Sequence, residues 1–151
     1  MFCNPGIDKI ITLNPTYGMY NVSAKINNIE NITVNLDSSF QIDTDRVISK
    51  FDTNTKIIFI TNPNNPTGNV FDDRSITKII ERFEGIVFID EAYVDYSKKS
   101  FLKKLNSHDN LIISQTFSKA LGLAGIRLGV GYASEEIIDY LNKVNASFME
   151  L

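Results

Sequence analysis

Residues 56–68 read Lys-Ile-Ile-Phe-Ile-Thr-Asn-Pro-Asn-Asn-Pro-Thr-Gly, an apolar run followed by a loop rich in asparagine and proline. Residues 57–60 are apolar on both faces of an extended chain, which is typical of a strand buried within a parallel sheet. The prolines stop the strand, and together with Gly68 they define a rigid loop after it. A simple turn explains the prolines and the glycine, but not the adjacent Asn64 and Asn65. The amide of an asparagine at this place can donate a hydrogen bond to a ligand oxygen.

Similar patterns extend outward from this strand in both directions. Further strands are expected at residues 9–13, 32–36, 86–89, 111–113 and 128–132. Helices are expected to begin after Asp43, after Asp72 or Asp73, and after Ser134. The middle helix buries Ile76, Ile79, Ile80 and Phe83, with Gly85 as its stop.

This alternation of strands and helices predicts an α/β fold with helices on both faces of the sheet. In such sheets, polar residues just after the strand ends line the ligand crevice. The segments that follow Leu13, Thr61, Ile89 and Ile113 are therefore the candidates for a binding site.

Length and composition limit the remaining possibilities. The chain has 151 residues, enough for one domain with a hydrophobic core. A net charge of −3 and a pI of about 5.1 argue against a nucleic-acid or anionic-membrane partner. Cys3 is the only cysteine, which excludes an internal disulfide, and we predict no metal site. Without a membrane-spanning run or a signal peptide, a cytoplasmic protein is expected.

The second chemically informative stretch, Asp90-Glu91-Ala92-Tyr93, directly follows an expected buried strand. An aspartate in that position is costly unless it meets a cation, so one interpretation is a carboxylate that holds a protonated heterocycle. The other interpretation is a helix N-cap, which needs no ligand. These four residues alone favour the N-cap.

The third stretch, Thr116-Phe117-Ser118-Lys119, follows the strand at residues 111–113. A lone lysine is usually a solvated surface charge. A lysine placed between a buried strand and an apolar, glycine-containing segment can instead be desolvated, which lowers its pKa and makes the amine nucleophilic. Arg127 follows eight positions later. Its guanidinium suits a phosphate dianion, although a surface ion pair is the simpler interpretation.

Taken together and in this order, Asn65-Pro66-Thr67-Gly68, Asp90 to Tyr93, Thr116 to Lys119 and Arg127 resemble the fold-type I, pyridoxal-phosphate-dependent aminotransferases of class I/II. Residues 2–6, 15–20 and 119–127 are similar in particular to the histidinol-phosphate aminotransferases of that family. The resemblance covers essentially the whole chain. It implies a three-layer α/β/α large domain with a mostly parallel sheet. It also implies a homodimer that transfers an amino group between L-histidinol phosphate and 2-oxoglutarate in histidine biosynthesis.

The resemblance further implies eight cofactor-site residues. Lys119 is the catalytic residue, which binds pyridoxal phosphate covalently and then moves a proton at the substrate carbon. Asp90 pairs with the pyridine nitrogen and keeps it protonated. The other contacts are Asn65 and Tyr93 to the ring hydroxyl, Tyr17 stacked on the ring face, and Thr116, Ser118 and Arg127 to the phosphate. Tyr20 is assigned instead to the core or to a subunit contact.

The chain also departs from the resemblance, because relatives of this kind are considerably longer. Residues 1–151 are expected to be a single cofactor-binding core, incomplete at both ends. The N-terminal arm and the C-terminal small domain are the missing parts. Little or no transaminase activity is expected of this polypeptide alone, since substrate positioning contributes strongly to catalysis. Two alternatives remain open: another fold-type I enzyme, such as a threonine-phosphate decarboxylase, or a non-catalytic remnant.

Overall fold

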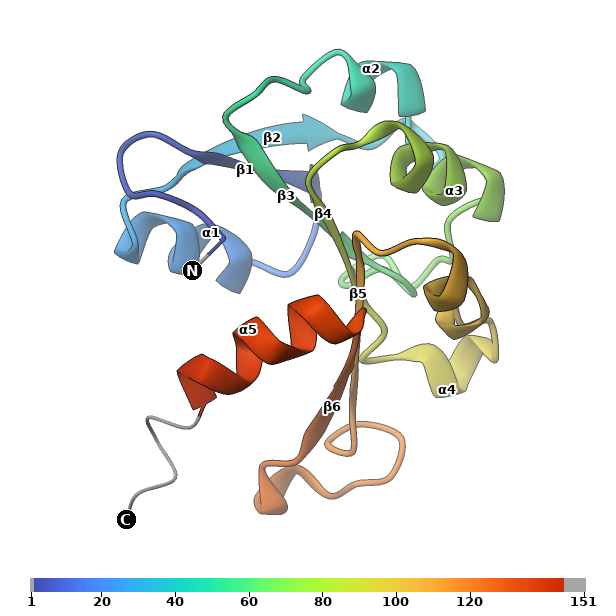
Figure 1. Cartoon of the computed structure of the whole chain (residues 1–151). Coiled ribbons are helices and arrows are strands. Elements are labelled where there is room, and N and C mark those ends of the chain that lie inside the picture. The colour runs from blue at the N-terminus through green and yellow to red at the C-terminus, as the bar shows by residue number, and fades with distance from the viewer. Residues whose placement is uncertain (1, 146–151) are drawn as a thin grey trace.

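The structure is a computed structural model that describes residues 2–145, which form a six-stranded sheet flanked by helices (Figure 1). The strands are β1 (Lys9–Asn14), β2 (Glu30–Asn35), β3 (Thr55–Thr61), β4 (Ile86–Asp90), β5 (Leu111–Thr116) and β6 (Gly129–Tyr132). They lie in the order β2-β1-β3-β4-β5-β6. All neighbours are parallel except β6, which runs antiparallel to β5. The predicted α/β fold with a mostly parallel sheet is confirmed.

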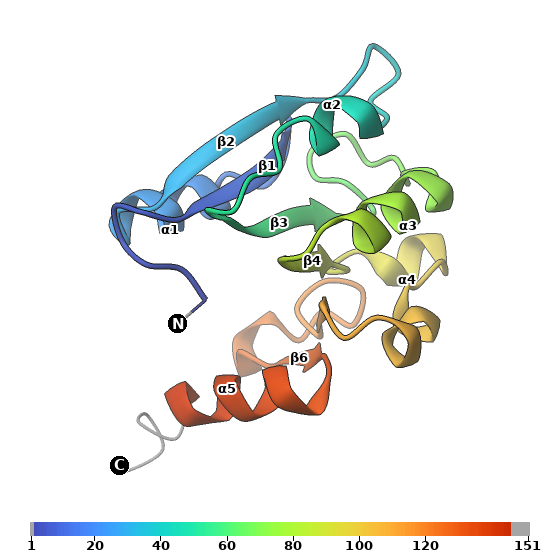
Figure 2. The same ribbon diagram turned by 45° about the horizontal axis from the view of Figure 1, so that its top comes forward.

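Helices cover both faces of this sheet (Figures 1 and 2). They are α1 (Met19–Ile26), α2 (Thr44–Ile48), α3 (Asp73–Arg82), α4 (Val94–Ser97) and α5 (Glu135–Asn145), with 3-10 helices η1 (Leu102–Ser107) and η2 (Ala124–Ile126). None of the helices in the described part of the chain is long and apolar enough to cross a membrane.

The alternation of side chains along β3 shows how the two faces are filled. Ile58 and Ile60 are fully buried in the main core, which also contains the buried side chains of α2 and α3. Ile57 and Phe59 point to the opposite face, where they pack with Ala24 of α1. The β3 apolar run thus contributes to both faces: Ile58 and Ile60 are buried, whereas Ile57 and Phe59 are half-buried beside α1.

Helix α3 follows the sequence prediction except at its end. Asp72 caps it by accepting a hydrogen bond from the Arg74 amide, and the predicted apolar stripe is buried. The prediction that Gly85 stops the helix is wrong, because the helix ends at Arg82. A Cβ at Gly85 would lie 2.6 Å from the carbonyl oxygen of Lys56. Gly85 is therefore needed for the close approach of β4 to β3.

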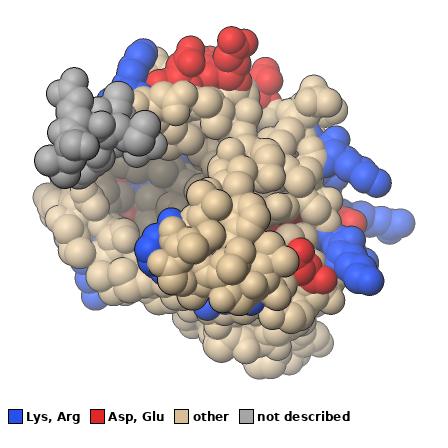
Figure 3. Space-filling model, turned by 90° about the horizontal axis from the view of Figure 1, so that it is seen from below, with Lys and Arg blue, Asp and Glu red and all other residues tan. Residues whose placement is uncertain are grey.

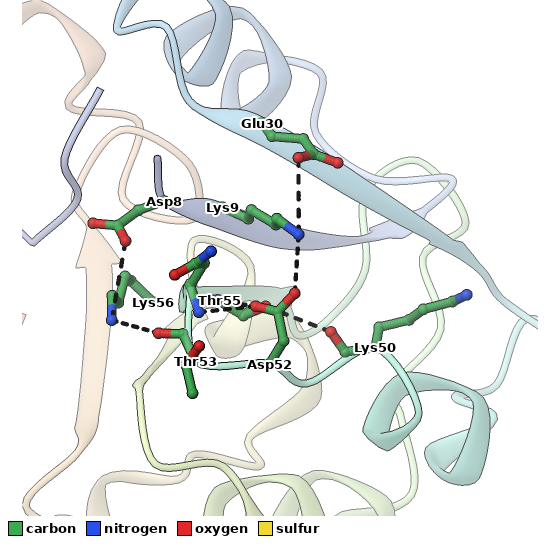
Figure 4. Close-up of polar contacts among 9 residues, drawn as sticks. Asp8, Lys9, Glu30, Lys50, Asp52, Thr53, Thr55 and Lys56 are labelled. Atoms are coloured by element: carbon green, nitrogen blue, oxygen red, sulfur yellow. Dashed lines mark hydrogen bonds and ion pairs between the residues drawn. The ribbon is translucent and has the colours of Figure 1, made fainter. Parts of the chain in front are cut away.

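Ion pairs link neighbouring segments of the sheet at the N-terminal ends of β1 and β3 (Figure 4). Lys9 Nζ lies 2.9 Å from Asp52 Oδ2 and 4.0 Å from Glu30 Oε2. Asp52 also accepts hydrogen bonds from the amide and the hydroxyl of Thr55. Together these bonds join the loop before β3 to β1 and β2.

Candidate functional site

The order of the strands reverses between β1 and β3. From β1 the chain moves outward to β2, and from β3 it moves in the opposite direction to β4 and β5. A crevice at the C-terminal ends of the strands forms at such a reversal, because the loops after the two central strands turn away from each other. The loops that follow β1, β3, β4 and β5 meet at this end, which is the end that the sequence analysis selected.

A cavity of about 160 Å³ lies among these loops. Five of the eight predicted site residues line it: Tyr17, Asn65, Asp90, Tyr93 and Lys119. Thr61 and Ala92 complete its lining. A larger hollow of about 400 Å³ adjoins the cavity and shares Asn65 and Tyr93 with it. The structure thus brings a carboxylate, an amine, an amide and two phenols to one place from four separate loops.

Asp90, the last residue of β4, is half-buried and held by two hydrogen bonds. Its Oδ1 accepts from the Ala92 amide at 3.0 Å, and its Oδ2 accepts from the Tyr20 hydroxyl at 2.5 Å. These contacts are not those of the helix N-cap, one of the two sequence interpretations. Helix α4 begins only at Val94, so Asp90 is not its N-cap, and no ion pair among residues 2–145 involves Asp90. Neutral donors thus satisfy part of the hydrogen-bonding capacity of the carboxylate, and Asp90 also lines the cavity.

Tyr20, which the sequence analysis assigned to the core or to a subunit contact, contacts the carboxylate of Asp90. Besides its bond to Asp90, its hydroxyl lies 3.0 Å from Thr61 Oγ1. Its ring stacks on Phe59 with centroids 4.7 Å apart. Burial raises the pKa of Tyr20, and the nearby Asp90 carboxylate raises it further. No local sequence pattern predicts the contact between Tyr20 and Asp90, because the two residues are 70 positions apart in the sequence.

Glu91, the residue after Asp90, is the buried carboxylate of this region, with a relative exposure of 1%. It accepts hydrogen bonds from the Ser100 hydroxyl, the Phe101 amide and the Gln115 side chain, at 2.7, 2.7 and 2.8 Å. These bonds fasten the segment before η1 to β5. Glu91 does not line the cavity.

The Lys119 side chain is exposed, so the predicted desolvation of this lysine is wrong for this structure. Its Nζ lies 5.4 Å from the centroid of the Tyr93 ring, an arrangement that attracts a cation to the ring face. Lys119 belongs to the segment 119–129, in which every residue is exposed. In Figure 1, this loop and β6 extend below the other strands.

The three residues predicted to bind phosphate do not line the cavity. The Thr116 hydroxyl accepts a hydrogen bond from the Ser118 amide at 3.2 Å. Arg127 is exposed, and its guanidinium donates to the Ala124 carbonyl at 3.3 Å. Seen from below, the surface is mainly uncharged and hollowed near its centre, with basic atoms beside the hollow (Figure 3).

The model of the family aminotransferase class I and II matches residues 1–149 of this chain. Among curated proteins, the chain is 52% identical over 148 residues to the histidinol-phosphate aminotransferase of Flavobacterium johnsoniae, covering 97% of this chain and 42% of that protein. It is 54% identical over 144 residues to the same enzyme of Parabacteroides distasonis, covering 95% and 42%. The chain therefore spans less than half the length of these relatives.

Solved structures show the same likeness. The histidinol-phosphate aminotransferase of Clostridium acetobutylicum matches with a TM-score of 0.84 and 26% identity, over 91% of this chain and 43% of that one. The pyridoxal-phosphate-bound C-S lyase of Staphylococcus hominis matches with a TM-score of 0.83 and 26% identity, over 94% and 39%. The second of these structures contains the cofactor that the sequence motifs predict.

Proposed function

Because this chain belongs to the aminotransferase class I and II family, we propose that it binds pyridoxal phosphate in the cavity beyond β1, β3, β4 and β5. One observation carries the proposal: Tyr17, Asn65, Asp90, Tyr93 and Lys119 come from four loops and line the same cavity. The sequence motifs select these residues for one cofactor, and only the fold brings them within reach of one small molecule.

The groups around the cavity fit this cofactor. Asp90 keeps lone pairs free after its two hydrogen bonds, so it can accept a third from a protonated ring nitrogen. Asn65 and Tyr93 supply an amide and a phenol hydroxyl, which are suitable donors to the ring hydroxyl oxygen. The partly exposed ring of Tyr17 offers an apolar face against which a planar heterocycle can stack.

Lys119 is the catalytic residue of the proposal. When bound, pyridoxal phosphate supplies an electron-withdrawing ring that stabilises negative charge on the substrate carbon. The Lys119 amine holds the cofactor and then takes up and returns a proton at that carbon. Thr116, Ser118 and Arg127 are the proposed phosphate ligands. Thr116 is the last residue of β5, and Ser118 and Arg127 follow it in the same loop as Lys119, although none of the three lines the cavity.

For the whole protein, we propose amino transfer between L-histidinol phosphate and 2-oxoglutarate by a homodimer. The support comes from the curated relatives at 52% and 54% identity, both named for this activity. The likeness to a C-S lyase favours a second candidate, elimination from a sulfur-containing amino acid on the same cofactor. Assay of the whole protein separates the two: transfer yields glutamate from 2-oxoglutarate, whereas elimination from a cysteine-type substrate yields pyruvate, ammonia and a thiol or sulfide.

The cofactor proposal is tested on this chain directly. The chain is incubated with pyridoxal phosphate, reduced with borohydride and digested, and the pyridoxyl group is located by mass spectrometry. Label concentrated on Lys119 is the expected result. Label spread evenly over the surface lysines would overturn the proposal, because it would show that no pocket directs the reaction to one amine.

A further inference from the structure

We infer that Tyr20 is a positioning residue for the cofactor's ring nitrogen: its hydroxyl donates to Asp90 and holds that carboxylate in the orientation that faces the cavity. The inference rests on the proposed function and deepens it, since it assigns a role to a residue that does not itself line the cavity. Tyr20 acts through Asp90, by a hydrogen bond of 2.5 Å.

The contacts determine which hydroxyl group donates in each hydrogen bond. A carboxylate only accepts, so the single proton of the Tyr20 hydroxyl is used in the bond to Asp90. The contact between Tyr20 and Thr61, at 3.0 Å, then requires the proton of Thr61. The contact between Thr61 and Thr16, at 3.2 Å, in turn requires that of Thr16. The result is a one-way chain from Thr16 through Thr61 and Tyr20 to Asp90, in which each bond polarises the next.

The Tyr20 ring is fixed independently of its hydroxyl. It stacks on Phe59 at an interplanar angle of 18° and contacts the Tyr17 ring edge-on, with centroids 5.6 Å apart. The raised pKa of Tyr20, caused first by burial and then by Asp90, keeps the hydroxyl protonated and able to donate. Thr61 is itself buried and is the cross-strand neighbour of Asp90. The donor therefore has a fixed position relative to the strand end that carries Asp90.

Two hydrogen bonds fix the Asp90 carboxylate, and it keeps capacity to accept more. The Ala92 amide binds Oδ1 and Tyr20 binds Oδ2, which prevents the carboxylate from rotating. A carboxylate offers about four lone-pair positions, so about two remain for a ligand. Without the Tyr20 hydroxyl, Asp90 would keep only the bond to its near neighbour in sequence and would lose its orientation.

The test compares two ligands on Tyr20→Phe. One is pyridoxal phosphate, and the other is its analogue with a C–H group in place of the ring nitrogen. Phenylalanine retains the stack on Phe59 and removes only the hydroxyl. Tyr20→Phe is expected to weaken pyridoxal phosphate binding about tenfold, the scale of one hydrogen bond to a charged group. Binding of the carbon analogue should change less than about twofold, because this ligand has no nitrogen for Asp90 to hold.

Tyr140→Phe is the matched control, because Tyr140 lies on α5, is exposed and is not among the residues that line the cavity. It should leave both affinities unchanged. Equal weakening of the two ligands by Tyr20→Phe would overturn the inference and reveal a packing role for Tyr20, while the cofactor proposal would stand. No change for either ligand would also overturn it. Failure of the unsubstituted chain to bind pyridoxal phosphate would overturn the cofactor proposal and the inference together.

Discussion

At the N-terminal ends of β1 and β3, lysines and carboxylates pair with each other. At the C-terminal ends of β4 and β5, Asp90 and Lys119 have no ion-pair partner among the described residues. Lys9 lies between Asp52 and Glu30, and Asp52 is further satisfied by Thr55 (Figure 4). Asp90 instead receives hydrogen bonds from a phenol and an amide and keeps capacity toward a cavity.

This difference separates charge that stabilises the fold from charge that is available to a ligand. Charges that pair with each other have little reason to bind a small molecule, because the ligand would have to displace an existing partner. A half-buried carboxylate held only by neutral donors can still accept a bond from a cation. We call the N-terminal ends of β1 and β3, where the charges pair with each other, the closed end of the sheet. The C-terminal ends of β4 and β5, where Asp90 lines a cavity, are the open end.

The largest effect is expected at the open end, from Lys119→Ala. The pyridoxyl label fixed by borohydride at residue 119 should fall to background, because the amine that forms the covalent bond is gone. Lys103→Ala, which removes another exposed lysine, should leave the label at Lys119 unchanged. If total specific labelling survived Lys119→Ala, a different lysine would be the cofactor's partner.

Glu91→Ala tests whether a fully satisfied carboxylate beside the open site is structural. The substitution leaves the Ser100 hydroxyl, the Phe101 amide and the Gln115 side chain without their acceptor. The free energy of unfolding should fall by roughly 3 kcal/mol, measured by urea denaturation. Glu81→Ala, at an exposed position of α3, should change it by less than about 0.5 kcal/mol. Equal stability of the two variants would contradict the structural role of Glu91.

Gly85→Ala acts at the closed end, where β4 starts beside β3. The new Cβ would lie 2.6 Å from the Lys56 carbonyl oxygen, and a backbone atom in a sheet cannot move aside easily. A loss of about 1–3 kcal/mol is expected, the usual cost of overpacking. Gly131→Ala is the control, because a Cβ there meets nothing within 4 Å. Thermal melts of the two variants give the comparison, and a neutral Gly85→Ala would refute the close-approach explanation.

The smallest effect is expected from Asp52→Asn. Hydrogen bonds from Lys9 and Thr55 lower the pKa of Asp52 from 3.8 to about 2. Because the pKa is lower in the folded state, Asp52 stabilises the fold above about pH 4. That contribution is lost as the pH falls toward 2. Asp52→Asn should therefore lower the Tm slightly at pH 6, and the difference from the unsubstituted chain should disappear near pH 2.

Salt provides the check on this last prediction, since the Lys9–Asp52 pair is close to solvent and high ionic strength screens it. The Tm difference at pH 6 should shrink in about 1 M salt. Asp139→Asn removes a carboxylate from the exposed side of α5 and should show no such pH-dependent difference. A difference that persisted at pH 2 would mean that Asp52 acts through packing and not through its charge.

The sequence alone predicted the buried strands and the motifs with candidate site residues near their C-terminal ends. The apolar runs at 57–60 and 86–89 predicted β3 and β4, and the spacing from Ile76 to Phe83 predicted the buried face of α3. The motifs that contain Asn65, Asp90 and Lys119 were located because each lies at or a few residues beyond the C-terminal end of a strand. These are local properties, set by the period of a strand or helix and by the residues that stop it.

The tertiary structure decided which residues meet. Helix α1 was not predicted from the sequence; in the structure its apolar residues Met19, Val22 and Ile26 are exposed and Ala24 is its buried residue. The position of α1 beside β3 nevertheless brings Tyr20 to Asp90. At Gly85, the close approach to the Lys56 carbonyl oxygen leaves no room for a Cβ atom. The exposure of Lys119 likewise follows from the path of the loop between β5 and β6. Such contacts depend on strand order and helix placement, which bring together residues far apart in the chain, and no local period encodes them.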